Sequence, residues 1–384
     1  MRMNRYKLGD ICEIVSGSTP KTNIDEFWDG DIKWITPAEL NDDSYIINDS
    51  VRKITDLAVK KTGLTSFPEG TVILSSRAPI GKVAIAGCEM YCNQGFKNLI
   101  CSEKINSKYL YWFLKGNTEF LNSLGRGATF KEISKQIVAN IEINVPEQEQ
   151  QLEIERHLEK VSEIIKLRKQ ELLKLDNLIK ARFVEMFGDP VLNPFGWEQI
   201  TLKDVAVGKL SYGSGASATD YNGECRYIRI TDITDNGELN SDIKSPDKYD
   251  EKYLLHDGDI LFARSGATVG KTFRYSAEKH GKGVYAGYLI RLIPNQGKVL
   301  PDYVFYYTKT EYYASFVKKA QRAVAQPNIN AQEYGDLIIC VPPINLQKEF
   351  MEFVEQVDKS KVAVQKALDE AQLLFDSLMQ KYFG

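Results

Sequence analysis

The feature that most constrains this chain of 384 residues is a segment that occurs twice. The first copy, residues 145–188, reads VPEQEQQLEIERHLEKVSEIIKLRKQELLKLDNLIKARFVEMFG, and the second, residues 341–384, reads VPPINLQKEFMEFVEQVDKSKVAVQKALDEAQLLFDSLMQKYFG. One constant offset aligns the copies without a gap, so that Gln151 matches Gln347 and Phe187 matches Phe383. The chain is therefore predicted to contain two units of one design.

Both copies have the spacing of an amphipathic helix. Apolar residues recur every three or four positions, while Glu, Lys and Arg fill the other faces. Pro146 and Pro342 suit a helix start, and Gly188 and Gly384 suit a helix stop. About forty residues at about 1.5 Å each give a rod of about 60 Å, and a narrow stripe on so long a rod favours a paired coiled coil over an ordinary surface helix. The stripe residues that we expect on the pairing and partner-binding helices are Leu152, Val161, Leu172, Ile179, Val357, Val364, Leu368 and Leu378.

The duplication extends beyond the helices. Residues 34–40 align with 227–233, residues 67–77 with 255–264, and residues 109–114 with 303–308. The aligned segments lie about half the chain apart, and a repeat that long indicates a duplicated domain, because solenoid repeats are much shorter. The predicted organisation is a first domain at 1–145, a first long helix at 146–188, a second domain at 189–341 and a second long helix at 342–384, with a Pro- and Gly-rich linker at 188–196.

Each domain is predicted to be rich in strands. Short apolar runs such as 71–74 and 98–101 are separated by turn signals such as Phe67-Pro-Glu-Gly70. One aromatic helix is expected from Ser107 to about Leu124, and its copy from Pro301 to about Ala320. The predicted fold class is α+β, with two tandem β-rich domains, each followed by a long helix, and the two helices pairing as an antiparallel coiled coil.

Composition restricts the class of protein. The chain is 43% hydrophobic and 26% charged, as globular proteins are, and it shows no signal peptide and no stretch apolar enough to span a membrane. Six scattered cysteines without CxxC spacing predict reduced thiols in a cytoplasmic protein and disfavour a zinc site. The net charge of −3 argues against nucleic acid for the chain as a whole, but one basic face would be enough.

The catalytic motifs that we considered are incomplete. Residues 265–272, SGATVGKT, resemble a phosphate-binding loop, but the first glycine is one position late and a strand is predicted where a helix should follow. The carboxylates of residues 246–252 crowd into one polar loop, whereas metal-dependent nucleases collect theirs from adjacent strands. The three histidines, His157, His256 and His280, do not occur in the context of a serine or cysteine nucleophile. We interpret the chain as non-catalytic.

What recurs in both copies is a set of polar, glycine-containing loops with a basic residue. Arginine reads guanine edges, Asn and Gln read adenine, and lysine or serine holds phosphate, so these loops are candidates for DNA binding. Ordinary surface turns and solvated charges are the alternative explanation for each residue taken singly. The candidate DNA-binding residues are Ser18, Thr19, Lys21, Thr36, Arg77, Lys82, Arg126, Thr129 and Lys131 in the first copy, and Tyr212, Ser214, Arg229, Arg264, Lys271, Arg322, Gln326 and Asn328 in the second.

The order of these motifs resembles the DNA-specificity subunit of type I restriction–modification systems. The resemblance covers residues 7–384 and depends on the strand-Arg-turn-Gly-Lys element, on the GATFKEIS and QPNIN segments ending at 134 and 330, and on the Val-Pro helices that close on Phe-Gly. It implies two target-recognition domains and a coiled coil that docks two methyltransferase subunits, with restriction subunits in the full complex. It also implies that S-adenosylmethionine, magnesium and ATP are bound by those partner subunits, and that this chain binds no cofactor or metal.

The expected function is therefore recognition of double-stranded DNA. Two similar domains related by an antiparallel helix pair would each read one half-site, and because the domains differ in sequence, the half-sites should differ. Two other classes remain open: a coiled-coil adaptor that joins proteins without touching DNA, and a nucleotide hydrolase that uses residues 265–272. The target sequence itself cannot be inferred from the residues.

Overall fold

The computed structural model describes residues 3–77, 79–127, 131–322 and 327–384, and it divides into two compact units. Unit 1 comprises residues 1–169 and 366–384, and unit 2 comprises residues 170–365. Each unit therefore contains one strand-rich domain and part of each long helix. Within the described part of the chain, no helix has both the length and the apolar character needed to cross a membrane.

In unit 1, the first and last strands of the domain pair with each other, and two further sheets lie between them in sequence. The strands β1 and β10 are antiparallel, the five-stranded sheet has the order β2-β9-β6-β7-β4, and the three-stranded sheet has the order β5-β3-β8. The strands are β1 (Met3–Lys7), β2 (Cys12–Val15), β3 (Trp28–Ile35), β4 (Ile46–Ile47), β5 (Lys53–Ile54), β6 (Val72–Leu74), β7 (Val83–Ala86), β8 (Tyr91–Cys92), β9 (Asn98–Cys101) and β10 (Glu142–Pro146). The helices are α1 (Leu8–Ile11), η1 (Asp25–Phe27), η2 (Pro37–Glu39), α2 (Asp56–Thr62), α3 (Ser107–Gly116), α4 (Thr118–Ser123), α5 (Lys135–Ala139) and the long α6 (Gln148–Phe187).

Unit 2 repeats this scheme. Its first and last strands, β11 and β20, are antiparallel, its main sheet has the order β12-β19-β16-β17, and two smaller pairs are β13-β15 and β14-β18. The strands are β11 (Glu198–Thr201), β12 (Ser211–Tyr212), β13 (Ala218–Asp220), β14 (Arg226–Ile228), β15 (Lys244–Pro246), β16 (Ile260–Ala263), β17 (Thr272–Arg274), β18 (Gly283–Tyr285), β19 (Leu289–Leu292) and β20 (Ile338–Val341). The helices are η3 (Leu202–Val205), η4 (Ile230–Asp232), η5 (Glu251–Tyr253), η6 (Gly266–Thr268), α7 (Ala277–His280), α8 (Pro301–Tyr307), α9 (Glu311–Arg322), α10 (Ala331–Gly335) and the long α11 (Ile344–Phe383). The predicted α+β class is confirmed.

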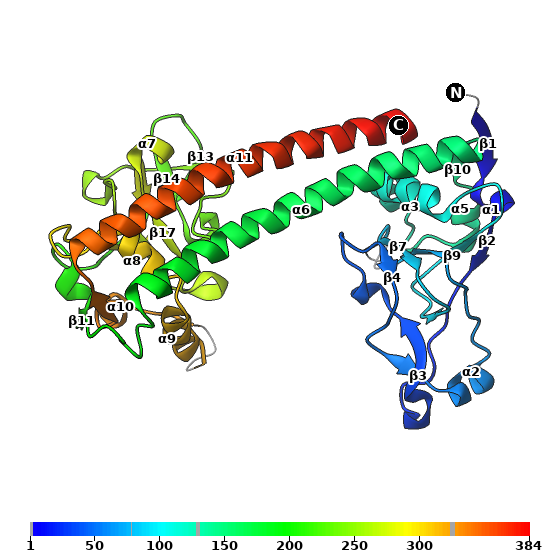
Figure 1. Ribbon diagram of the computed structural model, residues 1–384, viewed down its shortest axis with the longest axis horizontal. Coiled ribbons are helices and arrows are strands. Elements are labelled where there is room, and N and C mark those ends of the chain that lie inside the picture. The colour runs from blue at the N-terminus through cyan, green and yellow to red at the C-terminus, as the bar shows by residue number, and fades with distance from the viewer. Residues whose placement is uncertain (1–2, 78, 128–130, 323–326) are drawn as a thin grey trace. The chain divides into compact units, whose positions relative to one another are not determined.

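Aromatic side chains join each domain to the long helices. In unit 1, the end of α11 lies beside α3 (Figure 1), with the rings of Trp112 and Phe375 5.7 Å apart and those of Tyr109 and Phe383 5.2 Å apart. Such pairs contribute about 0.5–1.5 kcal/mol each beyond the area that they bury. In unit 2, Phe183 at the end of α6 joins the domain to both long helices. Its ring lies 5.4 Å from that of Tyr303 on α8 and 5.4 Å from that of Phe350 on α11.

The two long helices contact each other within each unit. In unit 2, Asp176 forms an ion pair of 2.6 Å with Lys361 and, further along α6, Phe183 packs on Phe350, so these segments of α6 and α11 run in opposite directions. In unit 1, His157 Nδ1 lies 3.1 Å from the hydroxyl of Tyr382. Of the predicted stripe, Val161, Ile179, Val357 and Val364 are buried, Leu172, Leu368 and Leu378 are half-buried, and Leu152 is 42% exposed.

A buried glutamine fixes the start of each long helix. Gln151 Nε2 donates hydrogen bonds of 3.0 Å to the carbonyls of Pro146 and Lys104, and its Oε1 accepts one of 2.8 Å from the amide of Asn106. Its match in the second copy, Gln347, makes the same three contacts: 2.8 Å to the Pro342 carbonyl, 3.1 Å to the Lys298 carbonyl and 2.8 Å from the Leu300 amide. Both side chains are fully buried, so the duplication predicted from sequence extends to individual hydrogen bonds.

The aromatic helices differ from the prediction of one continuous helix in each domain. In unit 1, the helix breaks at Asn117, whose side-chain amide donates to the Phe113 carbonyl at 2.8 Å and so takes part in ending α3. In unit 2, the break follows Tyr307, where the hydroxyls of Thr308 and Thr310 donate to preceding carbonyls at 2.7 and 2.8 Å. Short polar side chains that bond to the nearby backbone compete with continuation of the helix.

Candidate nucleic-acid interface

Two matched glycine loops begin the candidate interface. A Cβ added to Gly17 would lie 2.0 Å from the carbonyl oxygen of Cys92, and one added to Gly213 would lie 2.3 Å from that of Ala286, so neither position accepts a side chain. These close contacts bring the loop that follows β2 against the end of β8, and the loop that follows β12 against the residue after β18.

The next residue of each loop is held by an aromatic side chain. Trp34 Nε1 donates to the carbonyl of Ser18 at 3.1 Å, and the hydroxyl of Tyr227 donates to the carbonyl of Ser214 at 2.9 Å. Ser18 is exposed, whereas Ser214 is buried and its hydroxyl accepts from a backbone amide two residues on. The sequence match between the two loops is thus also a structural match. The serine hydroxyl faces solvent in unit 1, at Ser18, but not in unit 2, at Ser214.

A second tryptophan fixes the rest of the unit 1 loop. Trp28 Nε1 donates to the carbonyl of Lys21 at 3.3 Å, and the guanidinium of Arg52 lies 3.7 Å from the centre of the Trp28 ring. Because the backbone is fixed at these points, the exposed side chains of Thr19 and Lys21 project from a defined frame.

The turn that carries Arg77 forms what we call the first corner, made of Ser76, Arg77, Lys97 and Glu132. Arg77 Nε donates to Glu132 at 3.0 Å, and Lys97 Nζ lies 3.4 Å from the other oxygen of the same carboxylate and 3.3 Å from the Ser76 hydroxyl. Lys97 is only 7% exposed, so Glu132 joins a buried and an exposed cation. The backbones of Arg126 and Glu132 exchange hydrogen bonds of 3.1 and 3.0 Å. Of the other candidates here, Arg126 and Lys131 are exposed, and Thr129 lies outside the described residues.

The second corner consists of Tyr212, Arg264, Tyr288 and Asn328. Arg264 Nε donates to Asn328 Oδ1 at 3.1 Å, and its guanidinium carbon lies 4.7 Å from the centre of the Tyr212 ring. The Tyr212 hydroxyl is fixed in turn, because it accepts from the amide of Ala331 at 3.0 Å. Among the described residues, none accepts a hydrogen bond from the Nη atoms of Arg264. Three residues proposed from sequence therefore meet at one place.

The structure corrects the alignment that matched Arg77 with Arg264. The carbonyl of Ser76 accepts from the amide of Ile133 at 2.9 Å, and the carbonyl of Arg264 accepts from the amide of Ile329 at 2.8 Å. Arg264 therefore corresponds to Ser76, and Arg77 corresponds to the residue after Arg264, because the turn of unit 2 is one residue longer before its Gly-Lys pair. Side chains of successive residues in extended segments point in opposite directions, so the two arginines are not equivalent.

Lys82 and Lys271 both hold a carbonyl group inside their own unit. Lys82 Nζ donates to the carbonyls of Leu40 and Pro37, and Lys271 Nζ donates to the carbonyl of Ile233 at 3.1 Å. Lys271 also forms an ion pair of 2.9 Å with Asp235. These contacts give both lysines a structural role, and their contact with DNA stays a prediction. Strand β17 begins at Thr272, directly after Lys271, so no helix follows the phosphate-loop-like segment.

Arg229 takes the place that Thr36 has in unit 1. The amide of Thr36 donates to Glu39 at 2.8 Å, and the amide of Arg229 donates to Asp232 at 2.9 Å, so each residue starts a short 3₁₀ helix. The guanidinium of Arg229 forms ion pairs of 2.5 Å with Asp232 and 2.8 Å with Asp242. The hydrogen bond that Arg229 donates to the Asp232 carboxylate is the main cause that raises the pKa of Arg229 above its usual range. Its charge is therefore balanced within the protein.

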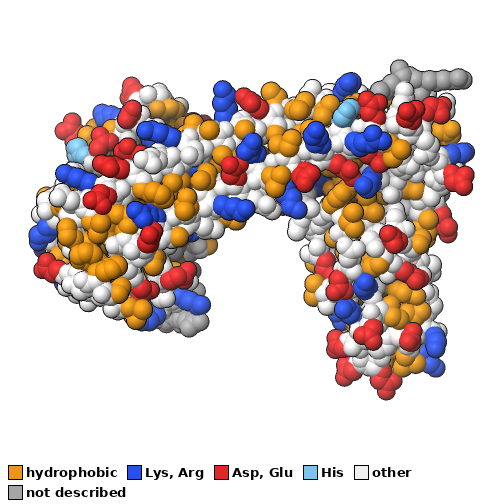
Figure 2. Space-filling model, viewed as in Figure 1, with side chains coloured by type: hydrophobic (Ala, Val, Ile, Leu, Met, Phe, Trp, Pro, Cys, Tyr) orange, Lys and Arg blue, Asp and Glu red, His pale blue; other side chains and the backbone are white. Residues whose placement is uncertain are grey.

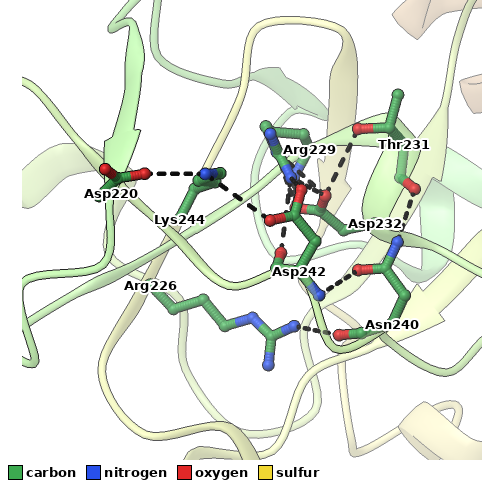
Figure 3. A network of polar contacts seen from close by, with 8 residues as sticks. All are labelled: Asp220, Arg226, Arg229, Thr231, Asp232, Asn240, Asp242 and Lys244. Atoms are coloured by element: carbon green, nitrogen blue, oxygen red, sulfur yellow. Dashed lines mark hydrogen bonds and ion pairs between the residues drawn. The ribbon is translucent and has the colours of Figure 1, made fainter.

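Figure 3 shows that Arg229 is part of a wider polar network. Lys244 forms ion pairs of 3.0 Å with Asp220 and 3.7 Å with Asp242. Because Asp232 is 1% exposed while Asp220 and Asp242 are on the surface, the network runs from the interior to solvent. At the end of α9, the side chain of Arg322 and all of Gln326 lie outside the described residues.

Sequence reasoning missed four residues of the corners: Ser76, Lys97, Glu132 and Tyr288. The amide of Lys97 donates to the carbonyl of Leu74 on β6, and the corresponding residue of unit 2 is Ile290 on β19. A charged residue at a position where the other copy has an apolar one was therefore an available signal. Tyr288 is 63% exposed, and its carbonyl accepts from the Arg264 amide at 3.1 Å. A large exposed aromatic residue at a turn next to a candidate arginine is a second such signal.

Comparisons with known proteins identify the family and the fold of this chain. The MjaIX specificity subunit, from a type I restriction enzyme of Methanocaldococcus jannaschii, is 28% identical over 407 residues, covering 98% of this chain and 91% of that protein. The fold is similar to the crystal structure of a type I restriction–modification S subunit from M. genitalium, with a TM-score of 0.58, 15% identity and coverage of 100% and 96%. It is also similar to a chain from work on complex assembly and conformational transition of the type I R-M system, with a TM-score of 0.61, 18% identity and coverage of 99% and 97%. Residues 2–177 and 194–371 both match the family described as type I restriction modification DNA specificity domain, and the chain belongs to this family of specificity subunits.

Proposed function

We propose that this specificity subunit reads a bipartite, asymmetric target on double-stranded DNA, with one half-site for each domain, and that its long helices dock methyltransferase subunits. The observation that carries the proposal is the pair of corners. The two domains build the same corner from matched backbone hydrogen bonds, but one corner contains the carboxylate of Glu132 where the other contains the amide of Asn328. Matched frames with different chemistry are what two different half-sites require.

The second corner suits recognition of a base edge. Arg264 donates its Nε–H to Asn328, and its guanidinium lies over the Tyr212 ring. The two Nη groups are used by neither contact and are therefore free to meet DNA. A guanidinium held in one orientation can donate two parallel hydrogen bonds to O6 and N7 of guanine, and such a contact contributes about 1–3 kcal/mol of discrimination. Tyr288, exposed beside it, provides apolar surface for a base or sugar.

The first corner should read DNA differently. Glu132 already binds Arg77 and Lys97, so it lowers the positive charge that this corner presents and orients Arg77 through Nε. A carboxylate can also accept a hydrogen bond from the amino group of cytosine, whereas an asparagine side chain pairs best with adenine. We therefore expect half-sites of different sequence.

The outer faces of the long helices support the docking proposal. The stripe that the helices share is largely buried, yet large apolar side chains remain exposed elsewhere on α6 and α11, between charged ones (Figure 2). Exposed apolar side chains rimmed by charge are typical of protein-binding surfaces. S-adenosylmethionine, magnesium and ATP would be bound by the methyltransferase and restriction subunits, while this chain supplies recognition. The exposed residues are Leu152, which was predicted to belong to the stripe, Ile164, Leu167, Leu373 and Leu374 in unit 1, and Leu173, Leu178, Val184 and Val362 in unit 2.

Co-expression with a methyltransferase subunit tests the proposal. Mapping of methylated adenines across a host genome should give one motif with two unlike half-sites at a fixed separation. A palindromic motif would contradict the assignment of different half-sites. If the complex forms but neither methylates nor shifts DNA in a salt titration, the chain is an adaptor that joins proteins without reading DNA.

A further inference from the structure

Two cysteines of unit 1 lie opposite each other on neighbouring strands. Cys12 on β2 is paired in register with Cys101 on β9, and the two strands are antiparallel. One position further along, the amide of Ser102 donates to the carbonyl of Ile11 at 3.0 Å. Hydrogen-bonded and non-hydrogen-bonded pairs alternate along an antiparallel ladder, so the cysteines form a non-hydrogen-bonded pair.

That position suits a disulfide. Non-hydrogen-bonded pairs have Cα atoms about 4.5 Å apart, which lies inside the range of about 4.4–6.8 Å found for disulfides. The two cysteines are direct partners in the ladder, and the neighbouring Cys101 thiol, together with burial, raises the pKa of Cys12. The register therefore places the two cysteines at a separation that a disulfide can bridge.

The two thiols differ in access to solvent, which sets an order for the reaction. Cys12 is 7% exposed and belongs to the main core of unit 1, whereas Cys101 is half-buried at the edge of that core. An oxidant therefore meets Cys101 first, and the buried Cys12 is in place to react with the oxidised sulfur. The other thiols of unit 1 have different neighbours: Cys92 accepts from Asn98 Nδ2 at 3.1 Å, and Cys88 accepts from Lys33 Nζ at 3.2 Å.

We propose that Cys12 and Cys101 form a reversible disulfide when the protein meets a peroxide. The Cys101 thiolate attacks one peroxide oxygen, the O–O bond breaks, and the product is a sulfenic acid and hydroxide, which takes up a proton to become water. The Cys12 sulfur then attacks the Cys101 sulfur, the S–O bond breaks, and the hydroxyl leaves as a second water. Two thiols are oxidised by two electrons and one peroxide is reduced to two waters. A small dithiol restores the reduced pair by exchange.

The bond would fasten the strand that leads into the candidate DNA loop. In the five-stranded sheet, β2 is an edge strand whose one paired neighbour among the described residues is β9. Its last residue, Val15, precedes the loop of Ser18, Thr19 and Lys21. An edge strand with one neighbour is the part of a sheet that separates most readily. A link between β2 and β9 restricts this separation in unit 1 alone, because unit 2 contains only Cys225 and Cys340, and neither is paired with the other.

The test is oxidation of the full chain with hydrogen peroxide, followed by alkylation and peptide mapping without reductant. We expect a linked peptide pair containing Cys12 and Cys101, about 2 Da lighter than the two free peptides and lost on addition of dithiothreitol. The melting midpoint of unit 1 should rise by about 5–10 °C, from the range typical of native disulfides. Cys92→Ser is the matched control and should keep both effects.

Cys12→Ser should stop the reaction at a sulfenic acid on Cys101, which dimedone traps, and should abolish the rise in melting midpoint. If this variant fails to fold, Cys101→Ser serves in its place and should leave Cys12 unmodified by peroxide. The proposal is overturned if the oxidised wild-type chain keeps both cysteines open to alkylation, if the linked peptide contains another cysteine, or if the midpoint does not rise.

Discussion

Replacement of Gln347 by leucine is the sharpest test of how the long helices are held. The side chain is fully buried, and leucine fills nearly the same volume, so the substitution removes hydrogen bonds without opening a large cavity. Three backbone groups lose their partner: the carbonyls of Pro342 and Lys298 and the amide of Leu300. These groups lie at the start of α11 and at the start of α8, so the change strikes the joint between domain and helix.

The expected loss follows from the number of orphaned groups. A buried backbone group without a partner costs about 1–3 kcal/mol, so three such groups would cost about 3–9 kcal/mol if all stayed dry. Water that enters at the start of the helix can bond some of these groups, which reduces the free-energy cost. We expect Gln347→Leu to lower the free energy of unfolding of unit 2 by about 3–5 kcal/mol.

Urea unfolding followed by circular dichroism measures the loss, and hydrogen exchange at the Leu300 amide locates it. Gln356→Leu makes the same chemical change at an exposed position of α11 and should alter stability by no more than about 0.5 kcal/mol. Gln151→Leu should reproduce the loss in unit 1. The reasoning is refuted if Gln347→Leu and Gln356→Leu have the same stability, or if exchange at Leu300 is unchanged.

Three further outcomes are expected. Arg264→Ala should weaken binding to the second half-site by about 1–3 kcal/mol and spare the first, measured with half-site variants in a binding assay; an equal loss at both would point to a folding defect. Burial raises the pKa of Glu155, so the contribution of this side chain to stability is present below its unfolded pKa and is lost as pH rises through the folded pKa. Glu155→Gln should therefore be more stable than wild type at pH 7.5, and the difference should shrink near pH 4. Glu153→Gln, at an exposed position, should leave the stability unchanged at both pH values. Insertion of one heptad into both long helices should change the gap between half-sites in methylation maps and leave each half-site intact.

The long helices and the fold class could be predicted because their signal is long. A helical period that is kept over forty residues has no counterpart in a strand, and α6 and α11 lie within the ranges expected for them. The aromatic helices show the limit of the same method. Their apolar spacing continues past Asn117 and Thr308, and only the hydrogen bonds of these side chains to their own backbone show where each helix ends.

The candidate site was predictable in part for a related reason. The glycine of each loop could be recognised in sequence, because Gly17 and Gly213 fall at matched positions in similar loops. The roles of the basic residues could not, because a lysine that holds a carbonyl and a lysine that faces solvent look alike in sequence. Lys82 thus proved to be bonded inside unit 1, and Arg229 to be balanced by two carboxylates.

Matched positions within the chain separate two kinds of constraint. Gln151 and Gln347 are identical and make identical bonds to buried backbone, where a change leaves groups unpaired at about 1–3 kcal/mol each. At the corners, the half-buried Glu132 of unit 1 corresponds to the exposed Asn328 of unit 2, and the side chain of each bonds to another side chain of its own corner, not to buried backbone groups. Internal bonds therefore keep the two domains alike, while the corners are free to diverge. The freedom to differ is concentrated at the surface that we propose meets DNA, so two unlike half-sites can be read by one duplicated fold.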